Sequence, residues 1–273
     1  MTVICRHASF RTRRQSGSRR VIQQRFPCKG MHRRKDMSSS CCAAAGSEAE
    51  VCALLGCDAA DAKAAIVSQL QQRLLGGTEA TWKLVVADSG VAGGGEGVHL
   101  RGACAAGTVL ACYPGVIYLP EDLPVMHKLV LPGNEYVLAR RDGVLLDGRP
   151  DGASAQIFAV AQQRDRAAGA AAAASARFAC GNKVNHPPAG QRPNVVVYPF
   201  DLLPEEHQAL HPFIPVSHFR PPAAGQASKQ TAVFIATRAL ADEELYLDYK
   251  LRPDGPLEPW YHPVEPLAAA AEG

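Results

Sequence analysis

Short strand-like segments separated by glycine, proline and turn residues fill the chain between Trp82 and Tyr249. They are rich in β-branched and aromatic residues, as strands are. They include residues 82–87, 97–100, 108–113, 115–119, 194–200 and 231–240. A doubly wound parallel sheet is excluded because it needs a helix between successive strands, and little helix lies between these. The pattern predicts an α+β, mostly β domain of short strands in several small sheets.

Turn and helix signals complete this region. The segment EYVLARRDGVLLDG predicts a hairpin, because Asp142-Gly143 stands between two apolar runs. Helices are expected near 153–164 and, beginning with proline, at 204–211. The alanine run at 167–176 fits a helix by propensity and a low-complexity insertion equally well. A last strand is expected to end at Asp248-Tyr249.

The chain divides into four parts by composition and periodicity. Residues 1–46 lack periodicity and are expected to be a disordered basic tail. Residues 47–77 are expected to be a helical segment: Ser47 begins a capping-box pattern, Asp58 is a second candidate N-cap, and apolar residues then recur every four positions. The β domain covers 82–250. Residues 251–273 are expected to be a tail rich in proline and alanine.

The charge is unevenly distributed. Residues 1–35 hold eleven Arg or Lys and no acid, whereas the remainder holds 18 basic and 26 acidic residues, a net −8. The basic head fits a transit peptide for a mitochondrion or plastid. It fits equally well a disordered tail that is nuclear or touches nucleic acid. No apolar run of about 18 residues occurs, so we expect no membrane span.

The cysteines favour an intracellular, reducing compartment. There are nine, an odd number, and no secretory apolar segment precedes them. No Cys-x-x-Cys pair occurs and no cysteine follows Cys180, so we expect no zinc site built from thiolates, and no other metal site is predicted.

Three distant segments carry candidate chemistry. The glycine-rich GGGEGVHL lacks the βαβ context of a dinucleotide site, but its backbone N–H groups suit a carboxylate. Asn185-His186 precedes two prolines, and Pro193-Asn194 runs into a strand. Tyr249 ends the acidic segment DEELYLDY. Taken singly, each fits an ordinary loop, turn or packed tyrosine.

Taken together, the segments resemble the SET-domain protein lysine methyltransferases. That family has, in order, a G-x-G turn, a Y-x-G strand, an N-H-x-x-x-P-N segment and a closing G-E-E-L-x-x-D-Y. The corresponding residues here are Gly95-Glu96-Gly97, Tyr113-Pro114-Gly115, Asn185-His186 with Pro193-Asn194, and Glu243-Glu244-Leu245 with Asp248-Tyr249. The resemblance covers about 170 residues. Within the family, YPGVIY, DGVLLDG and PNVVVYPFDL look most like the group named SET domain-containing protein nine.

The resemblance implies a SET-type fold with a C-terminal pseudoknot, in which the segment ending at Tyr249 passes through the Asn-His loop. It also implies S-adenosylmethionine as cofactor and a lysine side chain of a protein as substrate. The roles implied are catalysis for Tyr249, cofactor binding for Gly95, Glu96, Gly97, Asn185 and His186, and the lining of the substrate channel for Tyr113 and Tyr246. Trp260 and Tyr261 are candidates for an aromatic wall that closes the site.

The sequence also departs from the family pattern. Asp242 stands where the family usually has glycine, Lys183-Val184 replaces the usual Arg-Phe, and PAGQ lengthens the Asn-His loop. A catalytically inactive SET-fold binding module therefore remains an alternative, since a fold does not imply an activity. A nucleic-acid-associated protein is a second alternative, supported only by the basic head.

Overall fold

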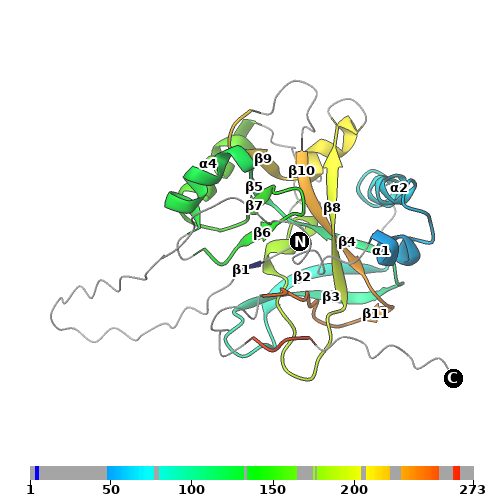
Figure 1. The fold of residues 1–273 in the computed structure, drawn as a ribbon. Coiled ribbons are helices and arrows are strands. Elements are labelled where there is room, and N and C mark those ends of the chain that lie inside the picture. Colours follow the sequence, from blue (N-terminus) through cyan, green and yellow to red (C-terminus); the bar gives the residue numbers. More distant parts are fainter. Residues whose placement is uncertain are drawn as a thin grey trace, which may run out of the picture.

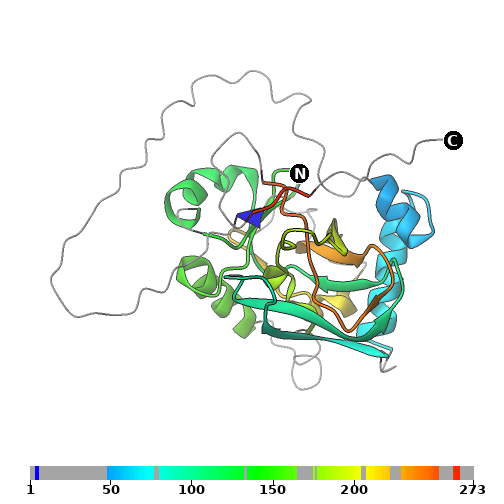
Figure 2. The same ribbon diagram turned by 90° about the horizontal axis from the view of Figure 1, so that it is seen from below.

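The computed structural model describes residues 4–5, 48–76, 80–131, 134–164, 175, 177–203, 207–221, 229–251 and 261–264. Within them the chain is α+β, with its strands in three small sheets (Figure 1). The helices α1 and α2 lie on one side of the sheets and α4 on the opposite side, as Figure 2 also shows.

The helical segment consists of α1 (Glu48–Leu55) and α2 (Ala62–Leu74). In α2 the buried residues are Ala62, Ile66, Val67 and Leu70, which share one face because they lie three or four positions apart. The expectation that Asp58 caps this helix is wrong. The N-cap of α2 is Asp61. The Asp58 carboxylate accepts the N–H of Asp61 in the turn that precedes the helix. Ser47 lies outside the described residues.

Arg73 fastens α2 to the sheets. Its guanidinium donates to the carbonyls of Val109 and Leu110, at 3.1 and 2.6 Å, and lies 4.2 Å from the Trp82 ring centroid. Burial lowers the pKa of Arg73 to about 10. The helical segment is therefore joined to the β domain by a buried polar contact as well as by apolar packing.

The first sheet has the order β11-β3-β2, the second β4-β10-β8 and the third β1-β6-β7-β5-β9. Their bounds are β1 Ile4–Cys5, β2 Trp82–Asp88, β3 Glu96–Cys104, β4 Val109–Cys112, β5 Gly115–Tyr118, β6 Val137–Ala139, β7 Leu145–Asp147, β8 Val195–Leu202, β9 Val216–His218, β10 Lys229–Ala236 and β11 Leu240–Ala241. Only β5 and β9 pair in parallel; the other described pairs are antiparallel.

The core lies between the sheets. Every residue of β4 and of β5 is buried, and so are nearly all residues of β10, so these strands are covered on both faces. This explains why β4, β5 and residues 232–236 of β10 are continuous apolar runs instead of alternating ones. The predicted hairpin is present as β6 and β7, and Gly143 in its turn has a φ of 85°, which glycine adopts without strain.

Several helical pieces are shorter than regular α-helices. They are η1 (Pro120–Asp122), α3 (Leu123–Val125), η2 (Met126–Val130), η3 (Gly181–Lys183) and η4 (Gln208–Phe213), whereas α4 spans Gly152–Arg164. Residues 204–206 of the helix expected at 204–211 lie outside the described residues, and the part that is described is η4, a 3-10 helix that begins at Gln208 and contains Pro212. Most of the alanine run lies outside the described residues, as does the greater part of each tail.

Two strand predictions near the C-terminus were wrong in extent. The strand expected at 231–240 ends at Ala236, and β11 then joins a different sheet. The segment ending at Tyr249 forms only isolated bridges, of Glu244 with His99, Tyr246 with Asn185 and Leu247 with Val195. In the described part of the chain, no helix is both long and apolar enough to cross a bilayer.

Candidate active site

The segment 243–249 is hydrogen-bonded on both of its sides by the loop 185–195. On one side the Leu247 N–H donates to the Asn185 carbonyl at 2.8 Å. On the other, the N–H groups of Asn194 and Val195 donate to the Tyr246 carbonyl, at 3.0 and 3.2 Å. The side chain of Asn194 accepts the Tyr246 N–H at 2.7 Å. The segment therefore lies between the two ends of this loop, and residues about 60 positions apart become neighbours.

Glu244 is the centre of a group of five residues that we call the carboxylate patch: Ser89, Gly90, Asn185, Glu244 and Tyr246. Its carboxylate accepts the Ser89 hydroxyl at 2.6 Å, the Gly90 N–H at 2.8 Å, the Asn185 amide at 3.3 Å and the Tyr246 hydroxyl at 3.0 Å. Burial alone raises the pKa of Glu244, but these donors outweigh it and the pKa is lowered. A buried, ionised carboxylate thus ties three segments together.

The glycine turn packs directly on this patch. A Cβ at Gly97 would lie 2.1 Å from Glu244 Oε1, so only glycine fits there. Gly95 has a φ of 62°, and a Cβ added at Gly95 or Gly93 would meet nothing within 4 Å. The backbone of this turn is therefore bordered by open space. Glu96 contacts Asn185, which is also predicted to bind the cofactor: the Glu96 carbonyl accepts the Asn185 amide at 3.0 Å.

A second group, which we call the aromatic patch, consists of His186, Tyr249 and Tyr261. His186 is buried, and its ring centroid lies 4.5 Å from that of Tyr261 and 5.5 Å from that of Tyr249. Nδ1 accepts the Tyr249 N–H at 3.2 Å, and Nε2 lies 2.8 Å from the His262 carbonyl, which can only accept. These partners assign the neutral tautomer with hydrogen on Nε2.

The environment of His186 favours its neutral form. Burial lowers the pKa of His186, although the His262 carbonyl and the Asp248 carboxylate oppose the shift. Asp248 lies 3.9 Å from Nδ1 and is too distant to outweigh burial. The imidazole therefore acts as a fixed link between the C-terminal residues 261–262 and the backbone of Tyr249.

Tyr249 is only 1% exposed, and its hydroxyl donates to the Val184 carbonyl at 2.9 Å. Val184 directly precedes Asn185 and His186, so the tyrosine predicted as catalytic lies against the predicted cofactor turn. Tyr249 and Asn185 are 64 residues apart in the sequence. The predicted residues Asn185 and Tyr246 therefore lie in the carboxylate patch, and His186 and Tyr249 in the aromatic patch, while Gly95, Glu96 and Gly97 form the turn that packs against the carboxylate patch.

The remaining predicted residues lie at different distances from this centre. Tyr113 is fully buried, and its hydroxyl donates to the Tyr136 carbonyl at 2.7 Å. The hydroxyl of Tyr246 points to the carboxylate patch, not to Tyr249, and the pKa of Tyr246 is raised by burial and by Glu244. Tyr261 anchors the tail: it is buried, and its hydroxyl accepts the Leu251 N–H. Trp260 lies outside the described residues.

The departures from the family pattern have structural counterparts. Asp242 has a φ of 47°, a conformation that glycine adopts freely and aspartate tolerates. It is held there by two hydrogen bonds with Gly102, whose N–H donates to its carboxylate. Lys183 pairs with the Glu96 carboxylate at 2.6 Å. The inserted PAGQ forms a turn in which the Gln191 N–H donates to the Pro188 carbonyl.

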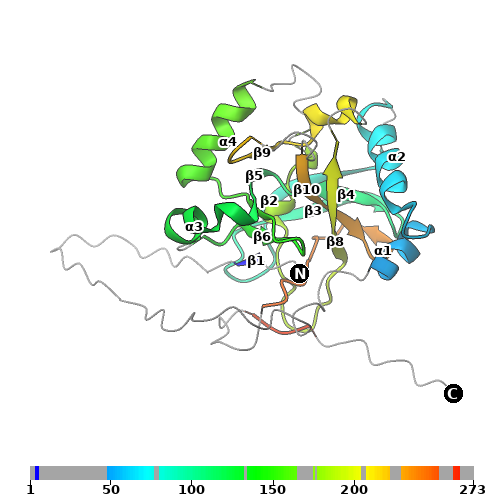
Figure 3. The same cartoon turned by 45° about the horizontal axis from the view of Figure 1, so that its top comes forward.

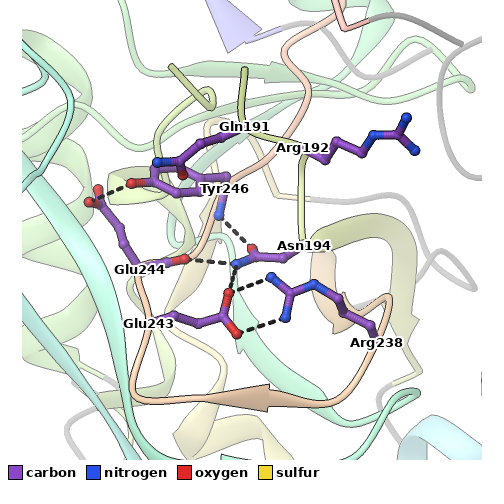
Figure 4. Close-up of a pocket in the computed structure, with 7 residues that line it drawn as sticks. All are labelled: Gln191, Arg192, Asn194, Arg238, Glu243, Glu244 and Tyr246. Atoms are coloured by element: carbon purple, nitrogen blue, oxygen red, sulfur yellow. Dashed lines mark hydrogen bonds and ion pairs between the residues drawn. The ribbon is translucent and has the colours of Figure 1, made fainter. Parts of the chain in front are cut away.

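A pocket of about 380 Å³ adjoins the carboxylate patch (Figure 4). It is lined by Gln191, Arg192, Asn194, Arg238, Glu243, Glu244 and Tyr246. Arg238 forms a paired salt bridge with Glu243, and the Asn194 amide donates to Glu243 and to the Glu244 carbonyl. These bonds hold the 238–244 turn against the loop that contains Asn194. In Figure 4, Arg192 points away from this network.

Sequence reasoning missed the role of Glu244 and its donors Ser89 and Gly90. Glu244 was part of the recognised motif, but no charge pattern indicates that its carboxylate is the common acceptor of three segments. Among the described residues, no group of three or more His, Cys, Asp or Glu is placed to hold a metal ion. No protein-family model and no curated protein sequence matches this chain.

Proposed function

We propose that the chain is a SET-type, S-adenosylmethionine-dependent protein lysine methyltransferase. The observation that carries the proposal is the convergence of three distant motifs. The Tyr249 hydroxyl lies 2.9 Å from the carbonyl that precedes Asn185-His186, and the Asn185 amide lies 3.0 Å from the Glu96 carbonyl. The passage of 243–249 between the ends of the 185–195 loop supports the pseudoknot that the proposal requires.

The residues present fit the cofactor. The backbone of the glycine turn borders open space at Gly93 and Gly95, so a ligand could approach it closely. Lys183, about a third exposed, would offer a cation to the cofactor's carboxylate, and Asn185 and Glu96 would bind its amino-acid end. His186 and Tyr261 would form the wall near the adenine. When bound, the cofactor supplies an electrophilic methyl group on a sulfonium.

The chain's own contribution would be positioning and desolvation. An incoming lysine has an ordinary pKa of about 10.4 and must lose its proton before it can attack. A site lined by buried aromatic rings disfavours the ammonium and so releases that proton to solvent. Tyr249, whose hydroxyl is oriented by the Val184 carbonyl, would hold the amine in line with the methyl group.

A transfer assay tests this proposal. Purified protein is incubated with tritiated S-adenosylmethionine and a cell lysate, and labelled proteins are resolved on a gel. We expect discrete labelled bands for the wild type and a loss of about 100-fold or more for Tyr249→Phe, because one orienting hydroxyl is removed. Tyr198→Phe, on β8 and outside both patches, is the matched control and should label normally.

One observation favours the inactive binding module as a second candidate. The Asn185 amide and the Tyr249 hydroxyl both donate to carbonyls of the chain itself, which stabilises the fold without any ligand. If the wild type captures a protein from the lysate but labels none, and Tyr249→Phe captures it equally well, the module is the better description.

A further inference from the structure

The third sheet ends on one side with β1, the two-residue strand Ile4–Cys5 from the start of the chain. Ile4 pairs with Leu138 and Cys5 with Val137, both in β6. Figures 1 and 3 show β1 beside β6 at the edge of the sheet. Among the strands that the structure describes, β6 pairs only with β7 and β1. Without β1, therefore, β6 would be an open edge strand, which is a template for another extended segment.

The hydrogen-bonding direction of β6 can be assigned from its neighbours. The Tyr136 carbonyl accepts the Gly148 N–H, and the Arg140 N–H donates to the Val144 carbonyl, so residues 136 and 140 point to the β7 side. Backbone groups of successive strand residues point to alternate sides. Val137 and Ala139 therefore point away from β7, and Val137 faces Cys5. The backbone groups of Ile4, by the same alternation, point away from β6.

This edge is connected to the candidate active site. The Tyr136 carbonyl, at the start of β6, accepts both the Tyr113 hydroxyl and the Gly148 N–H. The Gly148 carbonyl accepts the Asn182 amide at 2.8 Å, and Asn182 lies two residues before Val184, which binds the Tyr249 hydroxyl. Hydrogen bonds, together with the chain segment 182–184, thus connect the start of β6 with Tyr249.

Charge also favours docking of the N-terminal segment. Residues 1–35 contain eleven Arg or Lys and no acid, whereas the rest of the chain has a net charge of −8. A head and body of opposite sign attract one another over about 10 Å at about 0.1 M ionic strength, and over longer distances at lower ionic strength. The N-terminal segment that carries Ile4–Cys5 is therefore attracted to the body of the chain as a whole.

We propose that the edge of β6 is a docking site for an extended peptide segment, and that the chain's own residues Ile4–Cys5 occupy it by antiparallel strand addition. A protein substrate that docks at the same edge must first displace this segment; that consequence rests on the proposed function. A two-residue contact is weak by itself, but tethering places the segment at an effective concentration of about millimolar, so the inhibition is modest.

Amide hydrogen exchange on the full-length chain tests the docking without any reference to activity. Cys5→Pro removes an N–H that faces β6, whereas Ile4→Pro removes one that faces away and is the matched control. We expect the Val137 amide to exchange about fivefold or more faster in Cys5→Pro, and at the wild-type rate in Ile4→Pro. The Leu138 amide, directed to β7, should be unchanged in both. Equal Val137 rates in all three proteins would overturn the proposal.

The consequence for activity is tested separately by the initial rate of transfer to a lysate at limiting concentration. Cys5→Pro should label about threefold faster than the wild type. If Val137 exchange responds as expected but no variant transfers a methyl group, the docking is supported and the methyltransferase proposal fails. If transfer occurs while Val137 exchange does not respond, the docking is overturned and the enzyme remains.

Discussion

The carboxylate patch and the aromatic patch lie at two ends of the same segment, 244–249, but they are held in different ways. The carboxylate patch is a closed set of hydrogen bonds, with four donors directed to Glu244. The aromatic patch depends on ring packing and on one imidazole whose two nitrogens bind different segments. The first patch should therefore control the stability of the fold, and the second should control the position of Tyr249.

Replacement of Glu244 should give the largest loss of stability. Glu244→Ala leaves four donors without their acceptor, and we expect it to lower the free energy of unfolding by about 3 kcal/mol or more. Glu243→Ala is the matched control: its carboxylate is more exposed and accepts from a half-exposed arginine and from Asn194, whose amide keeps the Glu244 carbonyl as a second acceptor, so the loss should be about 1 kcal/mol. Urea unfolding followed by circular dichroism measures both. Equal losses would show that Glu244 and its donors stabilise the fold no more than Glu243 and its partners do.

Addition of one methyl group at Gly97 should have a smaller effect. Gly97→Ala places a Cβ against the Glu244 carboxylate and should cost about 2 kcal/mol, a typical overpacking penalty. In a Glu244→Ala background the carboxylate is absent, so the same change should cost about 1 kcal/mol less than in the wild type. The double-mutant cycle is measured by urea unfolding. If the effects of Gly97→Ala and Glu244→Ala are additive, the added methyl group does not clash with the Glu244 carboxylate.

The aromatic patch should give the smallest effect, visible as a dependence on pH. Because burial lowers the pKa of His186 below its ordinary 6.5, the unfolded chain takes up a proton at a higher pH than the folded chain does. The free energy of unfolding should therefore fall as the pH decreases below 6.5, and level off below the folded pKa. Groups that face His186 are Asp248, Tyr249, Tyr261 and His262.

His186→Gln is the variant that isolates this contribution, because its amide can still accept from Tyr249 and donate to His262. Thermal unfolding between pH 7.5 and 5 should show a weaker dependence on pH for this variant than for the wild type. The lowered pKa of Glu244 acts in a separate, more acidic range, so it does not obscure the comparison. An identical dependence in both proteins would exclude His186 as its source.

Most of the strands could be predicted from the sequence, and the reasons are local. Apolar runs bounded by glycine or proline predicted β2, β4 and β5, and the Asp142-Gly143 turn predicted the β6–β7 hairpin. The pieces that sequence reasoning missed are β1, β9 and β11, together with η1, α3 and η2. The missed strands are only two or three residues long, so their pairing partners determine them and their own periodicity does not.

The candidate site was predictable only in part. The positions of Asn185 and Tyr249 followed from the motif, but the role of Glu244 needed the fold, since its donors come from segments up to 155 residues away. The expected strand ending at Tyr249 is absent because the segment bonds to loop residues on both sides and so cannot join a regular sheet. The link from His186 to His262 had no signal in the sequence at all.

The most direct test of the central claim is equilibrium binding of S-adenosylmethionine, measured by calorimetry on the full-length chain. The account predicts one site, which Tyr249→Phe leaves unchanged within about threefold while transfer is lost, and which Asn185→Ala weakens about tenfold or more. The failure of folded wild-type protein to bind the cofactor, or equal binding by Asn185→Ala, would contradict the claim that these distant segments form a methyl-transfer site.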